Sequence, residues 1–311
     1  MTEINGENSS LKISTPGKII REILPPFFPP IPSDEIKGKE NLPHIEKLIN
    51  EGYSIVVLYN HFSSSDIFRT LEFVLKQKSM KNKEICVPII EDLYNYTKLI
   101  PKAAKIKFCS IVTQKEIDIL DRKHKKQYGK SEKSSHTTLD SLSRLKEKQM
   151  RERDKLVEQQ KPLNSLYFKT ALDTLRKGGI IIVAPQVTRD DSLKIPTEDS
   201  PTAVSTLIAR LDHDKLDKVA FLPIGLGIKN QTDYSEDKVG LYNLGKKYIL
   251  HIGPIFTKNE LRHLALEQYA EIQIEQKKTR RGVERVVIEE LAKLVPPEYL
   301  KSLPQQEQIR S

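Results

Sequence analysis

Residues 56–71 have the sequence VVLYNHFSSSDIFRTL, which joins three kinds of pattern. The first is an unbroken apolar run, typical of a strand buried on both faces of a sheet. The run ends at Asn60 and His61, three serines follow, and Asp66 stands where a helical periodicity begins. The stretch therefore predicts a strand, a short turn and a helix. Its polar side chains either cap that helix or form a catalytic pair.

The same alternation of strand and helix continues along the chain. Strands are predicted at 53–59, 84–90, 106–113, 180–185, 219–228 and 247–256, and helices at 42–51, 66–78, 165–177, 200–211, 258–276 and 282–295. Strands separated by helices are typical of a mainly parallel sheet with helices on both faces. The predicted fold is therefore α/β, a single three-layer domain with a mainly parallel or mixed sheet and a charged helical insertion.

The 311 residues are predicted to form one domain with two appended ends. A polar tail and a proline-rich apolar segment occupy 1–41, the main domain 42–296 with a basic helical insertion at 121–161, and a C-terminal tail 297–311. The proline-rich segment carries Phe27 and Phe28. It either packs on the domain or dips these rings into a membrane surface.

The net charge of +9 is concentrated in one segment. Residues 122–161 contain 13 lysines and arginines but 6 aspartates and glutamates. Such a block is either a solvated helical excursion or an attractive surface for an anionic membrane, an acidic carrier protein or nucleic acid. Tyr128 is its single aromatic residue, which argues against base stacking. No nucleic-acid partner is therefore expected.

Cysteine usage and hydropathy predict the compartment. Cys86 and Cys109 lie in apolar surroundings and lack the spacing of metal ligands, so free thiols in a reducing compartment and no metal are expected. No apolar run approaches the ~20 residues of a membrane-spanning helix, and no N-terminal signal pattern is visible. The predicted location is cytoplasmic, with peripheral attachment at the inner membrane face left open.

His61 and Asp66 are the first candidates for chemistry. One continuous helix would place them roughly 140° apart, but a turn lets Asp66 fold back towards the imidazole ring. A carboxylate on Nδ1–H would fix the tautomer and leave Nε2 free to accept a proton. Taken alone, this spacing fits a surface histidine and a capping residue better. The three serines lack the surroundings of a nucleophile elbow, and helix capping explains them.

Two later segments also end strands in unusual residues. In GGIIIVAPQVTRDD, residues 178–191, a strong strand leads into a turn with Thr188 and Arg189. An arginine here either binds a phosphate or pairs with a neighbouring aspartate. In VAFLPIGLGI, residues 219–228, Pro223 and two glycines interrupt a strand, which allows a chain or a ligand to approach closely.

In this order, NHFSSSD, APQVTRD, FLPIGLGI and YILHIGPIF resemble the successive blocks of the glycerolipid acyltransferase superfamily, over about residues 45–256. Members of this family carry an N-H-x-x-x-x-D block, a proline–arginine block commonly written F-P-E-G-T-R-S, and a V-P-V-like strand. The resemblance implies transfer of an acyl group from an acyl-carrier-protein or coenzyme A thioester to a hydroxyl of glycerol 3-phosphate or 1-acylglycerol 3-phosphate. It implies no cofactor, and it makes 42–296 an acyltransferase domain in phospholipid biosynthesis.

The resemblance also implies roles for individual residues. His61 would deprotonate the acceptor hydroxyl, Asp66 would orient His61, and Arg189 with Thr188 would bind the acceptor. APQVTRDD is similar to the A-P-x-G-G-R-D-R form of soluble plastid-type glycerol-3-phosphate acyltransferases, and Lys115 then falls at a phosphate-binding lysine.

The sequence departs from these patterns at several positions. Gln186 and Val187 replace the usual Glu-Gly, and Glu116 and Asp191 replace basic residues. The departures at Gln186, Val187 and Asp191 motivate a second hypothesis, a non-catalytic lipid or acyl-carrier binder on the same fold.

Overall fold

The computed structural model describes residues 35–61, 66–90, 105–112, 114–132, 138–185, 203–232, 247–268 and 279–302. The strands are β1 (Ile36–Lys37), β2 (Ser54–Tyr59), β3 (Ile85–Ile90), β4 (Ile106–Ile111), β5 (Ile180–Val183), β6 (Val219–Ile228), β7 (Tyr248–Ile252) and β8 (Phe256–Thr257). The helices are α2 (Leu42–Asn50), α3 (Asp66–Lys76), α5 (Gln114–Glu132), α6 (Leu139–Arg176), α7 (Ala203–His213), α8 (Lys258–Gln268), α9 (Thr279–Leu294) and α10 (Pro297–Ser302), with a short 3-10 helix η2 (Lys39–Asn41).

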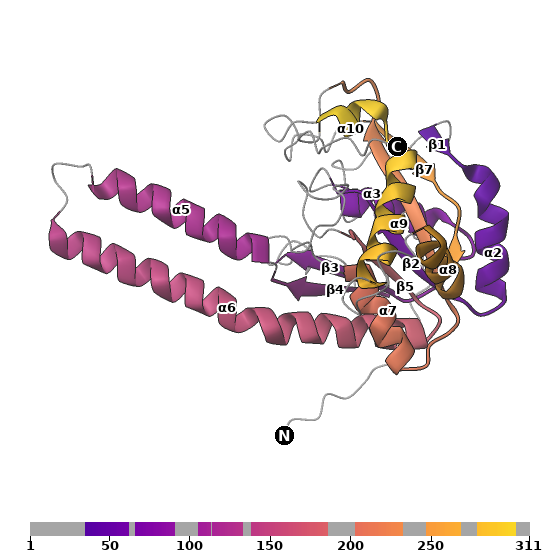
Figure 1. Cartoon of the computed structure of the whole chain (residues 1–311), viewed down its shortest axis with the longest axis horizontal. Coiled ribbons are helices and arrows are strands. Elements are labelled where there is room, and N and C mark those ends of the chain that lie inside the picture. The colour runs from indigo at the N-terminus through magenta and orange to yellow at the C-terminus, as the bar shows by residue number, and fades with distance from the viewer. Residues whose placement is uncertain are drawn as a thin grey trace, which may run out of the picture.

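The strands form one mixed sheet in the order β1-β7-β6-β2-β5-β3-β4, and β8 pairs with β6 (Figure 1). Strands β2 to β6 are parallel, whereas β7 and β8 run antiparallel to β6. Helices α6, α7 and α9 cover one face and α3 covers the other, as right-handed crossovers require when the chain moves both ways along a sheet. The predicted α/β fold class is confirmed.

The central strands are apolar because helices cover both of their faces. Every residue of β2, β5 and β6 is buried, which is the pattern of a strand within a parallel sheet. The ladder joins Leu58 of β2 to Val183 of β5 on one side and to Pro223 of β6 on the other. The carboxyl ends of β2 and β5 therefore lie beside one another at one edge of the sheet, and β6 continues in the same direction to Ile228.

Pro223 occupies a central strand, where a proline normally removes a ladder hydrogen bond. Strands β8 and β7 pair with β6 before and after this position, so its nitrogen faces the interruption between them. The Pro223 carbonyl still accepts a hydrogen bond from Gly253 N at 2.9 Å. A Cβ on Gly225 would overlap the Leu294 carbonyl at the end of α9. The close approach that the sequence indicated is therefore made by a helix.

Helices α5 and α6 form a long hairpin that projects from the sheet (Figure 1). The hairpin extends beyond the predicted insertion 121–161 at both ends, and α6 runs through Pro162 as one helix of 38 residues. Pro162 is exposed, so water can bind the carbonyl that a proline leaves without a partner. Further along, Ala171, Leu172 and Leu175 of the same helix are buried on the sheet. The outer part of α6 thus belongs to the projecting hairpin of α5 and α6, called the arm below, and its inner part belongs to the core.

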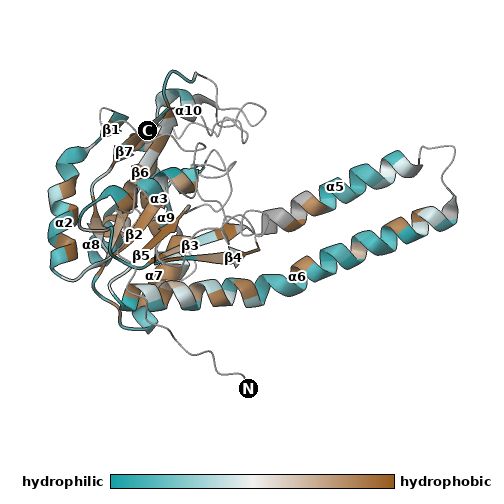
Figure 2. Cartoon of the chain, turned by 180° about the vertical axis from the view of Figure 1, so that it is seen from behind, coloured by the Kyte–Doolittle hydropathy of each residue, from teal (hydrophilic) through white to brown (hydrophobic). Residues whose placement is uncertain are grey.

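Polar side chains join the two helices of the arm. Arg153 Nε lies 3.1 Å from Asp121 Oδ1, and His124 Nε2 lies 3.1 Å from Glu152 Oε2. Where the hairpin meets the sheet, the Asn164 side chain accepts a hydrogen bond from the Val112 N–H and donates one to the Val112 carbonyl. Figure 2 shows the outer halves of both helices as largely hydrophilic. In the described part of the chain, no helix combines the length and the apolar character needed to cross a membrane.

A buried carboxyl group joins α9 to the start of α7. Glu284 is fully buried, and its Oε1 accepts hydrogen bonds from Ser205 N at 3.0 Å and Ser205 Oγ at 3.2 Å. Burial is the main cause that raises the pKa of Glu284 to about 8, and the bonds from Ser205 oppose it. A glutamate in an unfolded chain has a pKa of about 4.3. At intermediate pH the folded protein therefore holds a proton that the unfolded chain has lost.

The free energy of unfolding should consequently fall as the pH rises from about 4 to 8, by at most about 1.4 kcal/mol per pH unit from this group. Glu284→Gln keeps the Oε1 acceptor but carries no charge, so the variant should lack this fall. Urea denaturation at both ends of the pH range measures the effect, and Glu46→Gln, at an exposed position of α2, should behave as wild type. An unchanged pH profile in Glu284→Gln would assign the effect to another group.

Candidate active site

The turn after β2 begins with a buried asparagine. Asn60 Oδ1 accepts from Leu226 N at 2.6 Å, and Asn60 Nδ2 donates to Leu226 O at 3.0 Å. Because Tyr59 is already paired with Ile224, these bonds continue the β2–β6 ladder through a side chain. Asn60 thereby fixes the strand end from which His61 leaves. The sequence indicated this residue only as part of a motif, without a role.

His61 and Asp66 are in contact. The distance from His61 Nδ1 to Asp66 Oδ2 is 3.2 Å, and Asp66 is fully buried whereas the His61 side chain is 21% exposed. The geometry is that of a base with its orienting carboxylate. Asp66 is also the first residue of α3, so its carboxylate lies at the positive end of a helix dipole. The serines at 63–65, predicted to cap this helix, lie outside the described residues.

A second ring lies beside the imidazole. The Tyr59 and His61 ring centroids are 5.9 Å apart, with the ring planes at 69°. Tyr59 is fully buried, and burial, followed by the negative charge of Asp66, raises its pKa far above the ordinary value. Tyr59 is therefore a neutral phenol, and its buried ring packs against one side of the His61 imidazole.

Tyr248 lies beside the buried carboxylate and Arg69 lies over the Tyr248 ring; the sequence indicated neither residue. The Tyr248 hydroxyl lies 3.4 Å from Asp66 Oδ1, and the Arg69 guanidinium lies 5.1 Å above the Tyr248 ring. Arg69 follows Asp66 by three residues, which places both on one face of α3, and this spacing could have marked it. Tyr248 comes from a distant strand, and no local pattern points to it.

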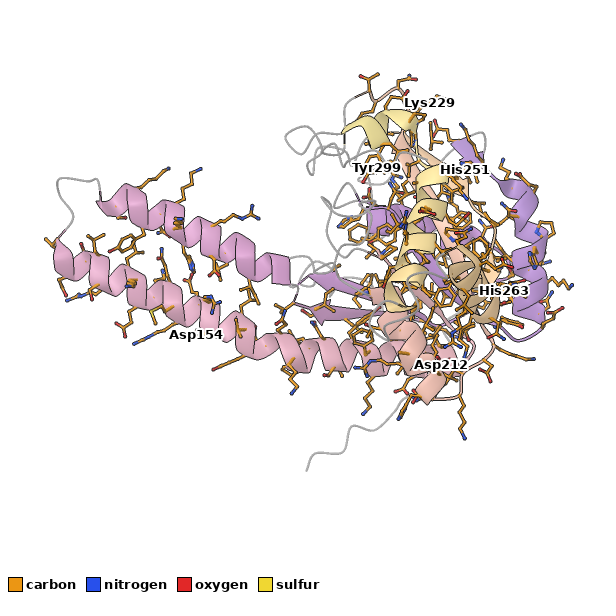
Figure 3. All side chains as sticks on the ribbon, in the orientation of Figure 1. Asp154, Asp212, Lys229, His251, His263 and Tyr299 are labelled. Carbon is orange, nitrogen blue, oxygen red and sulfur yellow. The ribbon has the colours of Figure 1, made fainter. Side chains whose placement is uncertain are left out.

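Two other predicted binding residues follow β5 in the sequence. Thr188 and Arg189, with the altered Gln186 and Val187, lie outside the described residues. The strand that leads to them, β5, is adjacent and parallel to β2 and is described as far as Pro185. The chain therefore leaves β5 beside the strand end that carries His61. Lys229 directly follows β6 and marks this edge in Figure 3.

Lys115 lies farther along the edge. Its backbone is in the first turn of α5, directly after β4, and its side chain lies outside the described residues. Strand β4 is three positions from β2 in the sheet. Three strand spacings amount to about 14 Å. A bound molecule would have to extend along the edge to meet both His61 and Lys115.

The described side chains support proton transfer. Among them there is no cluster of histidine, cysteine, aspartate or glutamate suited to a metal ion. His61 Nδ1 faces Asp66, so Nε2 is the nitrogen available to a substrate. Compared with protein-family models and with curated proteins, the chain matches none.

Proposed function

We propose that this protein is an O-acyltransferase that moves a fatty acyl group from an acyl thioester to a hydroxyl of a phosphorylated glycerol. The contact between His61 Nδ1 and Asp66 Oδ2 at the end of β2 carries the proposal. It supplies the base that such a reaction needs, and a thioester is already activated towards attack. The resemblance of the sequence blocks supports the choice of a phosphorylated glycerol as acceptor.

In the proposed reaction, every proton and leaving group is accounted for without a cofactor. His61 Nε2 takes the proton of the acceptor hydroxyl while the oxygen attacks the thioester carbonyl. The tetrahedral intermediate collapses to an ester, and the departing thiolate takes the proton from His61. A positioned base contributes about 10²–10⁴-fold to such a step, and binding both substrates in the right orientation contributes the rest.

The purified full chain tests this proposal directly. Acyl coenzyme A and acyl carrier protein serve as donors, and glycerol 3-phosphate and 1-acylglycerol 3-phosphate as acceptors. We expect thiol release that depends on the acceptor, with the new ester identified by mass spectrometry. Tight binding of lipid or acyl carrier without any turnover would instead support a non-catalytic binder.

Arg189→Ala should weaken binding of the acceptor more than turnover. A hydrogen bond to a charged group contributes about 1.5–3 kcal/mol, so the acceptor KM should rise roughly 10–100-fold while kcat changes little. An unphosphorylated monoacylglycerol is the matched control, because its reaction should be equally slow with and without Arg189. An unchanged KM for the phosphorylated acceptor would contradict the phosphate role.

We further propose that the protein works in the cytoplasm as a peripheral protein on an anionic membrane, through the basic face of α5. This basic face consists of the exposed Arg122, Lys123, Lys125, Lys126 and Lys130. At ~100° per residue these positions fall within an arc of about 160°, turned away from α6. Among the described residues none of the five has an ion-pair partner. On α6, by contrast, acidic and basic side chains pair, as in Asp140 with Arg144 and Glu147 with Arg151.

Neutralising the basic face should reduce binding to anionic vesicles. A lysine near a membrane contributes about 1 kcal/mol, so the triple variant Lys123→Gln, Lys125→Gln, Lys126→Gln should bind phosphatidylglycerol vesicles roughly 100-fold more weakly than wild type. The control is a triple variant at the exposed Lys146, Lys155 and Lys161 of α6, in the part of the arm near Asp154 (Figure 3). Equal losses in the two variants would show that net charge, rather than this face, determines binding.

A further inference from the structure

Because β7 is antiparallel to β6, a buried tyrosine of β7 lies at the edge of the sheet where β2 ends and His61 follows. Strands β2, β5 and β6 end at this edge, but β7 is antiparallel to β6, so β7 begins there. Its first residue, Tyr248, is the ladder partner of Ile228, the last residue of β6. Tyr248 is 1% exposed. Side chains alternate across a sheet, and the register places Tyr248 on the face that α3 covers.

Tyr248 and His61 each contact one oxygen of the Asp66 carboxylate. The Tyr248 hydroxyl lies 3.4 Å from Asp66 Oδ1, and His61 Nδ1 lies 3.2 Å from Asp66 Oδ2. The terminal torsion of an aspartate is broad and weakly restrained by itself. A donor on each oxygen restrains that torsion, so Asp66 Oδ2 stays directed at His61 Nδ1.

Arg69 holds the tyrosine ring in turn. The guanidinium lies 5.1 Å from the Tyr248 ring centroid, and its NH1 lies 3.3 Å from Glu72 Oε2. Arg69 and Glu72 are both buried, and Glu72 is also paired with Lys76 at 2.7 Å. A cation over an aromatic face is attracted to the ring, and this attraction restrains the position of the Tyr248 ring.

We propose that Tyr248 is a positioning residue, which holds Asp66 in the orientation that keeps neutral His61 in the Nδ1–H tautomer, while Arg69 holds the Tyr248 ring. Tyr248 transfers no proton itself. The consequence for turnover rests on the proposed acyltransferase function, whereas the consequence for the tautomer does not. Loss of this hydroxyl therefore affects His61 even if the substrate is another molecule.

The test is Tyr248→Phe, which retains the ring over which Arg69 lies and removes the hydroxyl. Nitrogen NMR of the full chain labelled at histidine reports the tautomer, and the resonance missing in His61→Ala assigns the signal. In wild type we expect His61 as Nδ1–H. In Tyr248→Phe we expect a mixture with Nε2–H, and an acyl-transfer kcat lower by about 10–100-fold with an unchanged acceptor KM.

Tyr53→Phe is the matched control, because Tyr53 directly precedes β2 at the opposite end of the strand. This variant should keep the wild-type tautomer and kcat. A Tyr248→Phe variant with the wild-type tautomer would overturn the proposal. An Nε2–H tautomer in the wild-type protein would do so without any variant, so a poorly folded variant does not leave the question open. If the wild type transfers no acyl group, the acyltransferase proposal fails, and the tautomer comparison still decides the role of Tyr248.

Discussion

The His61→Ala variant is expected to transfer acyl groups about 10²–10⁴-fold more slowly than wild type. The reason is that the His61 side chain is partly exposed and its Nδ1 lies 3.2 Å from a buried carboxylate, which leaves Nε2 as the nitrogen that could accept a proton. Without it, the acceptor hydroxyl must lose its proton to water. The measurement is the initial rate of acceptor-dependent thiol release at saturating donor and acceptor.

Stability measurements separate this loss from unfolding. The His61 side chain is partly exposed, so its removal should change the urea midpoint little. His263→Ala is the control, since His263 is exposed on α8 and pairs with Glu267 (Figure 3). That variant should retain wild-type turnover. A His61→Ala protein that folds and turns over like wild type would show that His61 is an ordinary surface histidine.

The Asp66→Asn variant should lose turnover to a similar extent and keep most of its stability. An amide can direct its NH2 group at His61 Nδ1, which then must be the unprotonated nitrogen. The proton is thereby placed on Nε2, where a base cannot accept another, and an effect on the order of 10²–10⁴-fold on kcat is expected. The volume and the polar character of the side chain are unchanged, so we expect a loss of stability of only about 1 kcal/mol.

Turnover and stability must be compared to decide whether Asp66 orients His61 or only supports the helix. Turnover and the urea midpoint are determined on the same preparation, with Asp154→Asn on the exposed arm as the control. A large loss of turnover with a small loss of stability supports the orienting role. Losses of comparable size in both would make Asp66 a residue that matters to the start of α3 and not to catalysis.

The sequence predicted most of the described strands and helices of the sheet domain, because both faces of the sheet are covered. The single strand predicted at 247–256 is instead two strands, β7 and β8. Continuous apolar runs such as 180–183 and 219–228 are typical of strands buried on both sides, and every residue of β5 and β6 is buried. These runs alternate with helical periodicity. The antiparallel direction of β7 could not be predicted, because a strand has the same apolar pattern in either direction. The two-residue β1 is too short to carry any pattern.

The arm was predicted less accurately. The sequence indicated a charged helical insertion at 121–161 and a separate amphipathic helix at 165–177. In the structure the two patterns share one helix, because the outer part packs on α5 through polar contacts and the inner part packs on the sheet. The predicted C-terminal tail 297–311 likewise contains α10, whose Tyr299 is buried.

The candidate site was predictable only where its residues are close in the sequence. His61 and Asp66 are five residues apart, and the turn between strand and helix brings them within 3.2 Å. Tyr248 is 182 residues from Asp66, and its place depends on the order and direction of three strands. Such contacts require the sheet topology, which local patterns do not determine.

The most direct test of the account is a crystal structure of the protein with bound glycerol 3-phosphate. The central claim is that two neighbouring strand ends supply a base and an anion-binding group to one substrate. The account predicts an acceptor hydroxyl within about 2.6–3.2 Å of His61 Nε2, with the phosphate bound by Arg189. A phosphate held elsewhere on the molecule, with no hydroxyl near His61, would contradict it.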